Sequence, residues 1–125
     1  MINKITSFKD LEIWQEAHSL VLEVYGITRD FPREEIYGLI SQIRRSAVSV
    51  AACIVEGHSR NTTKEFIKFL FDARGSSAET KYHLLLSKDL GYINSDVFEK
   101  LNNRYEILGK RINSLINSLE KNSNH

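Results

Sequence analysis

The stretch from Gln42 to Arg60, QIRRSAVSVAACIVEGHSR, constrains the fold more than any other part of the chain. Between Ala47 and Val55 only Ser49 is polar, so a helix formed here is apolar around almost its whole circumference. Such a helix has no solvated face and has to be covered on more than one side. We therefore predict a central helix that packs within its own chain and also contacts a second copy of the chain.

Two helices are predicted in the first half of the chain. Ser7 and Asp10 have the spacing of a capping box, and the apolar stripe that follows predicts a helix reaching about Asp30. Pro32 breaks this helix and suits the first position of the next one. The second helix is predicted over residues 37–58.

Two more helices are predicted in the second half. Thr62 and Glu65 repeat the capping-box spacing, and Gly91 is the expected left-handed residue after the third helix. Asn94 or Ser95 caps the fourth helix. This last helix has the most regular apolar heptad of the chain, formed by Val97, Leu101, Tyr105, Leu108, Ile112, Leu115 and Leu119.

The connections between these helices are short, which favours antiparallel neighbours. We predict an all-α fold, an antiparallel up-down-up-down four-helix bundle that forms one domain over residues 1–120, with a frayed polar tail at 121–125. Apolar residues exceed what one inward stripe can bury, so we predict a homo-oligomer. The predicted oligomer interface comprises Ala47, Ala51, Val55 and Phe71.

Composition and charge indicate where the protein works and what kind of partner it could bind. The N-terminus lacks the apolar core of a secretory signal, and the longest apolar run is about half a membrane span. The single cysteine, Cys53, fits a reducing compartment, and we expect a soluble cytoplasmic protein that does not enter the membrane. The net charge is only +1, but residues 37–90 carry eight basic and five acidic side chains. That local excess is a weak indication of a polyanionic partner.

Basic side chains at helical spacing are the strongest candidates for contacting nucleic acid. Rows of this kind can follow phosphates, and assembly into an oligomer would multiply their positive field. The alternative is a structural role, in which Glu65 and Asp72 partly neutralise Lys64 and Lys68. Glu56 would then pair with Arg44 or Arg45. The predicted nucleic-acid-binding residues are Arg44, Arg45, Arg60, Lys64, Lys68 and Arg74.

The sequence gives little support for catalysis or metal binding. Glu56 is predicted to be buried, and a buried carboxylate that stays ionised needs a partner. A structural ion pair or a bond at the helix end is a better interpretation of Glu56 than a catalytic role. Cys53 and His58 lie on different helical faces, and the pair Glu79 and His83 has nothing to complete a metal site. We therefore expect no enzyme activity, no metal and no cofactor.

Several segments taken together resemble a known family over about Phe8 to Ile93. The chain is similar to the bacterial four-helix bundle proteins encoded in intervening sequences of 23S ribosomal RNA genes. That family is related to the accessory variability determinant of diversity-generating retroelements. The segments that carry the resemblance are FKDLEIWQ (8–15), FPREE (31–35), YGL (37–39), SQIRRSAVS (41–49), EG (56–57), KEF (64–66), FL (69–70), ARGS (73–76), LLL (84–86) and LGY (90–92).

The resemblance implies a ring-like homopentamer, and in the retroelement relatives a basic surface that works with a reverse transcriptase and its RNA. The chain departs from the family pattern at residues 51–55, AACIV, where a Pro-Ala-Asn-Ile type of segment is common. We expect a non-enzymatic bundle that presents basic surfaces to RNA or to an RNA-bound protein. The alternative is a structural or protein-binding scaffold without nucleic-acid affinity, and a third reading is a bundle that binds a small molecule or metal.

Overall fold

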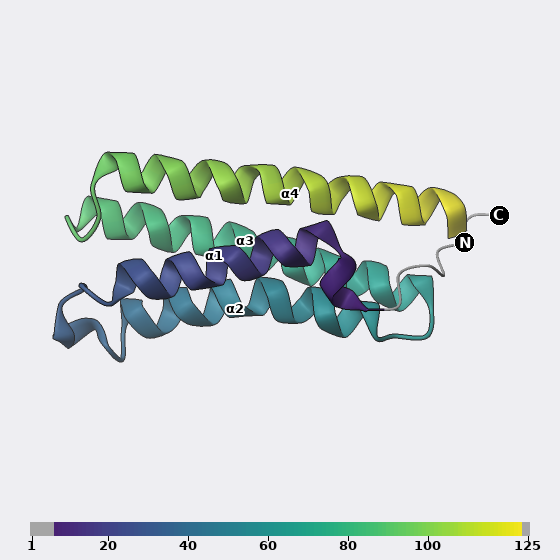
Figure 1. The fold of residues 1–125 in the computed structure, drawn as a ribbon, viewed down its shortest axis with the longest axis horizontal. Coiled ribbons are helices and arrows are strands. Elements are labelled where there is room, and N and C mark those ends of the chain that lie inside the picture. The colour runs from purple at the N-terminus through teal and green to yellow at the C-terminus, as the bar shows by residue number, and fades with distance from the viewer. Residues whose placement is uncertain (1–6, 124–125) are drawn as a thin grey trace.

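Four long helices run side by side along the length of the molecule (Figure 1). The computed structural model describes residues 7–123, and every regular element within them is helical, as predicted. The α1–α2 and α3–α4 connections lie at one end of the bundle and the α2–α3 connection lies at the other (Figure 1). The elements are η2 (Phe8–Asp10), α1 (Glu12–Thr28), η3 (Arg33–Glu35), α2 (Leu39–His58), α3 (Thr63–Asp89) and α4 (Ser95–Ser123). None of these helices is long and apolar enough to cross a membrane.

The first two helices begin later than the sequence pattern indicates. Ser7 caps the short 3-10 helix η2, where its Oγ accepts a hydrogen bond from the backbone N of Lys9, and α1 starts only at Glu12. Pro32 precedes the 3-10 helix η3 instead of opening α2, which starts at Leu39. In both places a tight turn of i to i+3 bonds precedes the α-helix and changes the direction of the chain.

The ends of α3 follow the sequence prediction. The Thr62 hydroxyl accepts a hydrogen bond from the backbone N of Glu65 at 3.1 Å. Gly91 has a φ of 82°, and its N donates to the carbonyl of Lys88 while the N of Tyr92 donates to the carbonyl of Ser87. This pair of bonds is a Schellman motif, which requires the left-handed residue that glycine supplies most readily.

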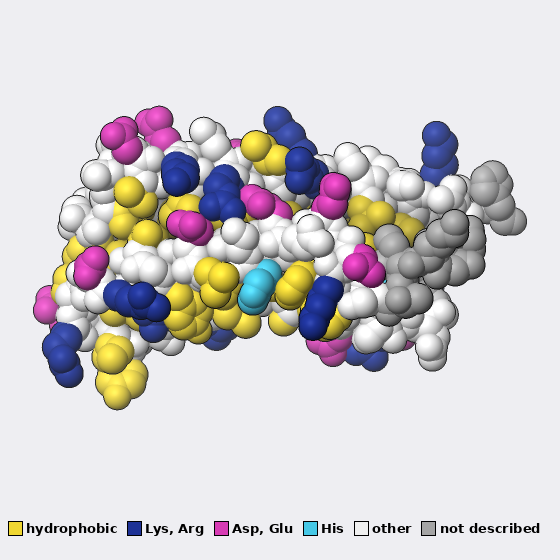
Figure 2. Space-filling view, viewed as in Figure 1, with side chains coloured by type: hydrophobic (Ala, Val, Ile, Leu, Met, Phe, Trp, Pro, Cys, Tyr) yellow, Lys and Arg dark blue, Asp and Glu magenta, His cyan; other side chains and the backbone are white. Residues whose placement is uncertain are grey.

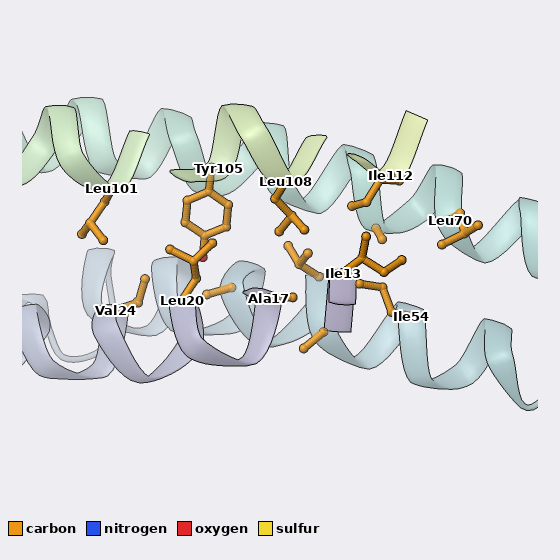
Figure 3. Close-up of a cluster of buried hydrophobic side chains, with 14 of the residues drawn as sticks. Ile13, Ala17, Leu20, Val24, Ile54, Leu70, Leu101, Tyr105, Leu108 and Ile112 are labelled. Atoms are coloured by element: carbon orange, nitrogen blue, oxygen red, sulfur yellow. The ribbon is translucent and has the colours of Figure 1, made fainter. Parts of the chain in front are cut away.

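The main core is a column of largely aliphatic side chains between the four helices, shown in Figure 3. Phe31, Leu39 and Ile40 form a second, smaller buried cluster. On α4 the predicted heptad residues Leu101, Tyr105, Leu108 and Ile112 are buried, whereas Val97, Leu115 and Leu119 are only partly buried. The next buried residue after Ile112 is Ile116 (2% exposed). The 3.6-residue helical period drifts away from a strict seven-residue repeat, which explains this change. The fully buried side chains include Leu20, Val24, Ile43, Val50, Ile54, Leu70, Leu84, Leu108 and Ile112.

Tyr105 is the one large polar side chain in this column among the residues described. Its ring points from α4 toward Leu20 of α1 (Figure 3), and burial raises the pKa of its hydroxyl. That hydroxyl has no hydrogen-bond partner in the described part of the chain.

Small hydroxyl side chains connect α2 and α3. The hydroxyls of Ser46 and Thr80 lie 2.8 Å apart, and those of Ser49 and Ser76 lie 2.9 Å apart. Ser46 and Thr80 are buried, so their polar groups need a partner inside the protein. Short side chains at these positions let the two helices approach closely.

Glu35 joins the two connections at one end of the bundle. Its Oε1 accepts a hydrogen bond from the backbone N of Leu39 at 3.0 Å, and its Oε2 accepts one from the Tyr92 hydroxyl at 2.9 Å. The bond to Leu39 caps α2 at its positive end. These two bonds, with the bond to Leu39 contributing most, hold the pKa of the Glu35 carboxyl below its usual value.

We expect Glu35 to make stability depend on pH. Because its folded pKa is lowered, its contribution is present above the pKa of the unfolded carboxyl and is lost as the pH falls through the folded pKa. Glu35→Gln should lower the midpoint of urea unfolding at pH 7, and the difference from wild type should shrink in acid. Tyr92→Phe, which keeps the carboxylate and the bond to Leu39, should retain the acid dependence. An equal difference between Glu35→Gln and wild type at all pH values would contradict this role.

Candidate nucleic-acid interface

Lys64 and Lys68 lie one turn apart at the start of α3, and both are exposed. They line a shallow groove of about 450 Å³ together with Ile67 and the half-exposed ring of Phe71. Neither ammonium group forms an ion pair within residues 7–123, so the predicted pairing of Lys68 with Asp72 is absent there. Both charges are therefore available to a partner.

Arg74 extends this surface by one more turn of α3. Its guanidinium stacks over the Phe71 ring at 4.7 Å from the ring centroid, and Nη1 donates to Asn113 Oδ1 on α4 at 2.7 Å. Asn113 is neutral, so the positive charge of Arg74 is oriented without being compensated. We refer to Lys64, Lys68, Phe71 and Arg74 as the α3 basic strip.

Arg60 differs from the strip because an acidic neighbour compensates its charge. Its Nη2 lies 3.0 Å from Glu56 Oε2, and its guanidinium stacks 4.8 Å from the centroid of the Phe69 ring. The prediction that Glu56 is buried was wrong: its side chain is 55% exposed, because it lies on the outer side of the last turn of α2. Its partner is Arg60 instead of Arg44 or Arg45.

Arg44 and Arg45 belong to a different surface. Arg44 turns toward α1, where its Nε donates to the Thr28 hydroxyl at 2.8 Å and its guanidinium stacks on Tyr25. Arg45 donates to Gln42 Oε1 on its own helix. Both arginines line a groove of about 450 Å³ between α1 and α2. The structure thus divides the six predicted residues between separate surfaces instead of gathering them into one patch.

Charge is mixed on one broad face of the molecule. On the face shown in Figure 2, lysine and arginine side chains alternate with aspartate and glutamate, and hydrophobic side chains lie between them. Part of this mixing is local pairing, since Arg104 of α4 contacts both Glu16 and Ser19 of α1 at 3.0–3.1 Å. The mixed charge of this face gives it little net field to attract a polyanion.

Two basic residues that face the α3–α4 groove were not among the predicted site residues. Lys81 lies seven residues after Arg74 on α3 and pairs with Glu106 at 3.1 Å. Lys110 of α4 lines the same groove, which also includes Arg74. The seven-residue spacing of Arg74, Lys81 and Lys88 was a signal for one side of this groove. The contribution of α4 becomes visible only when the two helices are placed together.

The structure corrects two of the predicted interface residues. Ala47 is fully buried and Ala51 is 8% exposed, both within the core of their own chain. They have little or no surface left for a second copy, because α1 and α3 cover the sides of α2 on which they lie. The outer side of α2 instead carries Val48 (41% exposed), Ala52 and the half-buried Val55. The predicted residues Val55 and Phe71 both retain exposed surface and stay predictions.

Histidine and cysteine side chains have local partners. His83 Nε2 lies 3.3 Å from Glu79 Oε2, and Cys53 Sγ lies 3.8 Å from the Ser49 hydroxyl. Burial raises the pKa of the Cys53 thiol. Within residues 7–123, no group of three or more His, Cys, Asp or Glu side chains is arranged to hold a metal ion.

Comparison with known proteins identifies the fold and the family. The bundle is similar to a crystal structure described as a protein of unknown function from the S23 ribosomal protein family of Bacteroides thetaiotaomicron, with a TM-score of 0.77 and 24% sequence identity. That match covers 83% of this chain and 97% of the other. No curated protein matches the chain. A family model for the 23S rRNA-intervening sequence protein matches residues 9–114. The chain therefore belongs to the family of 23S rRNA-intervening sequence proteins.

Proposed function

We propose that this protein is a non-enzymatic, cytoplasmic homo-oligomer of antiparallel up-down-up-down bundles that presents basic helix surfaces to RNA. By resemblance, the oligomer is a pentamer, and the RNA is held by or near a partner such as a reverse transcriptase. The observation that carries this proposal is the α3 basic strip, in which two lysines without ion pairs and one oriented arginine flank an exposed aromatic ring. A ring between cations suits contact with both phosphates and bases.

The membership of the chain in a family named for an insertion in 23S rRNA supports an RNA context for this surface. Assembly would strengthen RNA binding, because several copies would present several α3 basic strips to one RNA. In this arrangement the outer row of Val48, Ala52 and Val55 on α2 would contact the next copy. This leaves Lys64 and Lys68, at the start of α3, available to RNA.

A scaffold without nucleic-acid affinity is the second candidate. It is favoured by the arginines, because Arg44, Arg60 and Arg74 all stack on aromatic rings of their own chain. Exposed apolar side chains such as Tyr37 (94% exposed), Leu22 and Ile107 would then contact protein instead of RNA. Direct binding measurements separate the two functions.

We expect the wild-type protein to bind a structured RNA hairpin with an affinity that falls steeply as salt rises. A Lys64→Ala, Lys68→Ala double variant should bind more weakly, with the slope of log K against log salt reduced by about 2, since each lysine contributes about one phosphate contact. The measurement is fluorescence anisotropy across a potassium chloride series, with oligomeric mass checked by light scattering.

The matched control is Lys100→Ala with Lys121→Ala, which removes the same charge from exposed positions on α4. This control should keep the wild-type slope to within the error of the measurement. Equal losses in the two double variants would mean that net charge and not the α3 basic strip controls binding. Absence of wild-type binding at low salt would favour the scaffold.

A further inference from the structure

The groove between α3 and α4 brings together positive groups from both helices. Its α3 side is lined by Arg74, Ser77, Ala78 and Lys81, which follow one another at the i, i+3, i+4 and i+7 positions of a helical face. Its α4 side includes Glu106, Gly109, Lys110 and Asn113. The groove holds about 190 Å³, about six water volumes at roughly 30 Å³ each. It is large enough for a small polyatomic anion with a few waters.

Small residues keep this groove open. Ala78 contributes only a methyl group, and Gly109 has no side chain. A Cβ added to Gly109 would meet no atom within 4 Å, so the space beside this glycine is unfilled. Two of the longest side chains in the protein, Arg74 and Lys81, border the same opening without closing it.

The charged groups of the groove sum to +2, from Arg74, Lys81, Lys110 and the single carboxylate of Glu106. Lys81 compensates Glu106 directly, with Nζ 3.1 Å from Oε1. Arg74 donates only to the neutral amide oxygen of Asn113, and Lys110 forms no ion pair within residues 7–123. Two full positive charges are thus uncompensated at one opening.

Ser77 adds a polar side chain to the groove. Its residue is 3% exposed and lines the groove. Among the described residues, the buried side-chain atoms without a hydrogen-bond partner are His83 Nδ1 and the Tyr105 hydroxyl, so the Ser77 hydroxyl is not one of them. The Ser77 hydroxyl can donate a hydrogen bond to an acceptor oxygen placed in the groove.

We propose that the α3–α4 groove binds a phosphate group, held by Arg74, Lys110 and the Ser77 hydroxyl, with Lys81 completing the donors. A phosphate offers several acceptor oxygens, which matches a set made almost entirely of donors. This site lies beyond the α3 basic strip and shares only Arg74 with it. The phosphate group is that of a nucleotide, with a terminal monoester, or that of an internal diester in an RNA strand.

The first experiment titrates the ¹⁵N-labelled protein with inorganic phosphate and follows amide chemical shifts, using chloride at the same ionic strength as the reference. We expect saturable shifts confined to residues 74–81 and 105–113. Lys110→Ala should weaken the fitted affinity about five- to tenfold, because it removes an uncompensated charge. The Lys64→Ala, Lys68→Ala variant, which leaves the groove intact, should keep the wild-type affinity and thereby separates this proposal from the RNA-binding one.

Glu106→Gln gives the opposite expectation. It removes the one carboxylate of the groove and frees Lys81, so phosphate affinity should rise about three- to tenfold. A purely structural role for the Lys81 and Glu106 pair would lower stability without raising affinity. Gly109→Leu, which would fill the space beside the glycine, should abolish the localised shifts while leaving the protein folded.

The source of the phosphate is decided by two further probes, adenosine monophosphate and a short unstructured RNA without terminal phosphates. Binding of the mononucleotide alone assigns a terminal monoester, and binding of the RNA assigns the internal diester. Shifts spread over the whole surface and equal to those with chloride would overturn the site. An unchanged affinity in Glu106→Gln and Lys110→Ala would overturn it as well.

Discussion

Ala47→Glu is expected to destabilise the folded chain strongly, whereas the same change at Ala52 should leave the stability of each chain unchanged. Ala47 is fully buried between α2 and its neighbours, so a glutamate there would place an uncompensated charge in the core. We expect a loss of about 3–5 kcal/mol in the free energy of unfolding. A domain of this kind has only about 5–15 kcal/mol in total. Urea unfolding followed by circular dichroism measures the loss.

Ala52 lies on the exposed side of the same helix, so Ala52→Glu tests assembly without disturbing the core. If the outer side of α2 contacts a second copy, the variant should give a smaller native mass in light scattering at an unchanged unfolding midpoint per chain. Asn103→Glu, at an exposed position of α4, is the control for added charge. An unchanged mass for Ala52→Glu would remove this side of α2 from the interface.

Gly57→Ala is expected to destabilise the protein even though alanine is the better helix former. An added Cβ would lie 2.8 Å from the Cβ of Phe69 and 3.3 Å from the backbone oxygen of Phe66. These atoms cannot move without displacing α3, so the end of α2 would be forced away from it. We expect a loss of about 1–3 kcal/mol from overpacking, measured by urea unfolding.

Gly75→Ala is the matched comparison, because a Cβ at Gly75 would meet no atom within 4 Å. There the higher helix propensity of alanine acts alone, and we expect a gain of about 0.5–1 kcal/mol. A gain at both glycines would mean that the contact between Gly57 and Phe69 is looser than the structure shows. A loss at both would point to an interface over the middle of α3.

The helices could be predicted because their signals are local. The Thr62 cap and the left-handed Gly91 depend on residues a few positions apart, and both were confirmed. The apolar heptad of α4 was confirmed from Leu101 to Ile112. The spacing of the apolar residues in α2 also indicated one buried face, but it did not show how far around the helix its neighbours cover it. Ala47 and Ala52 are chemically identical, and only the positions of α1 and α3 decide which of them is covered.

In the candidate site, too, the local features could be predicted from the sequence and the contacts between helices could not. The basic residues at the start of α3 could be recognised from their spacing, since Lys64 and Lys68 share one face of a helix. The contact of Arg74 with Asn113 joins residues 39 positions apart. The burial of Glu56 was predicted wrongly because the sequence places apolar residues before it but does not show that its side of the helix faces outward.

The two hydroxyl pairs between α2 and α3 have a consequence for how the chain chooses among alternative packings. Apolar side chains alone tolerate a shift of one helix past another by a turn, since one leucine replaces the next at little cost. Such a shift would separate Ser46 from Thr80 and Ser49 from Ser76 at the same time. The two hydroxyl pairs therefore raise the free energy of misaligned arrangements more than they lower that of the correct one. They give α2 and α3 one preferred alignment, although the apolar side chains of the two helices repeat.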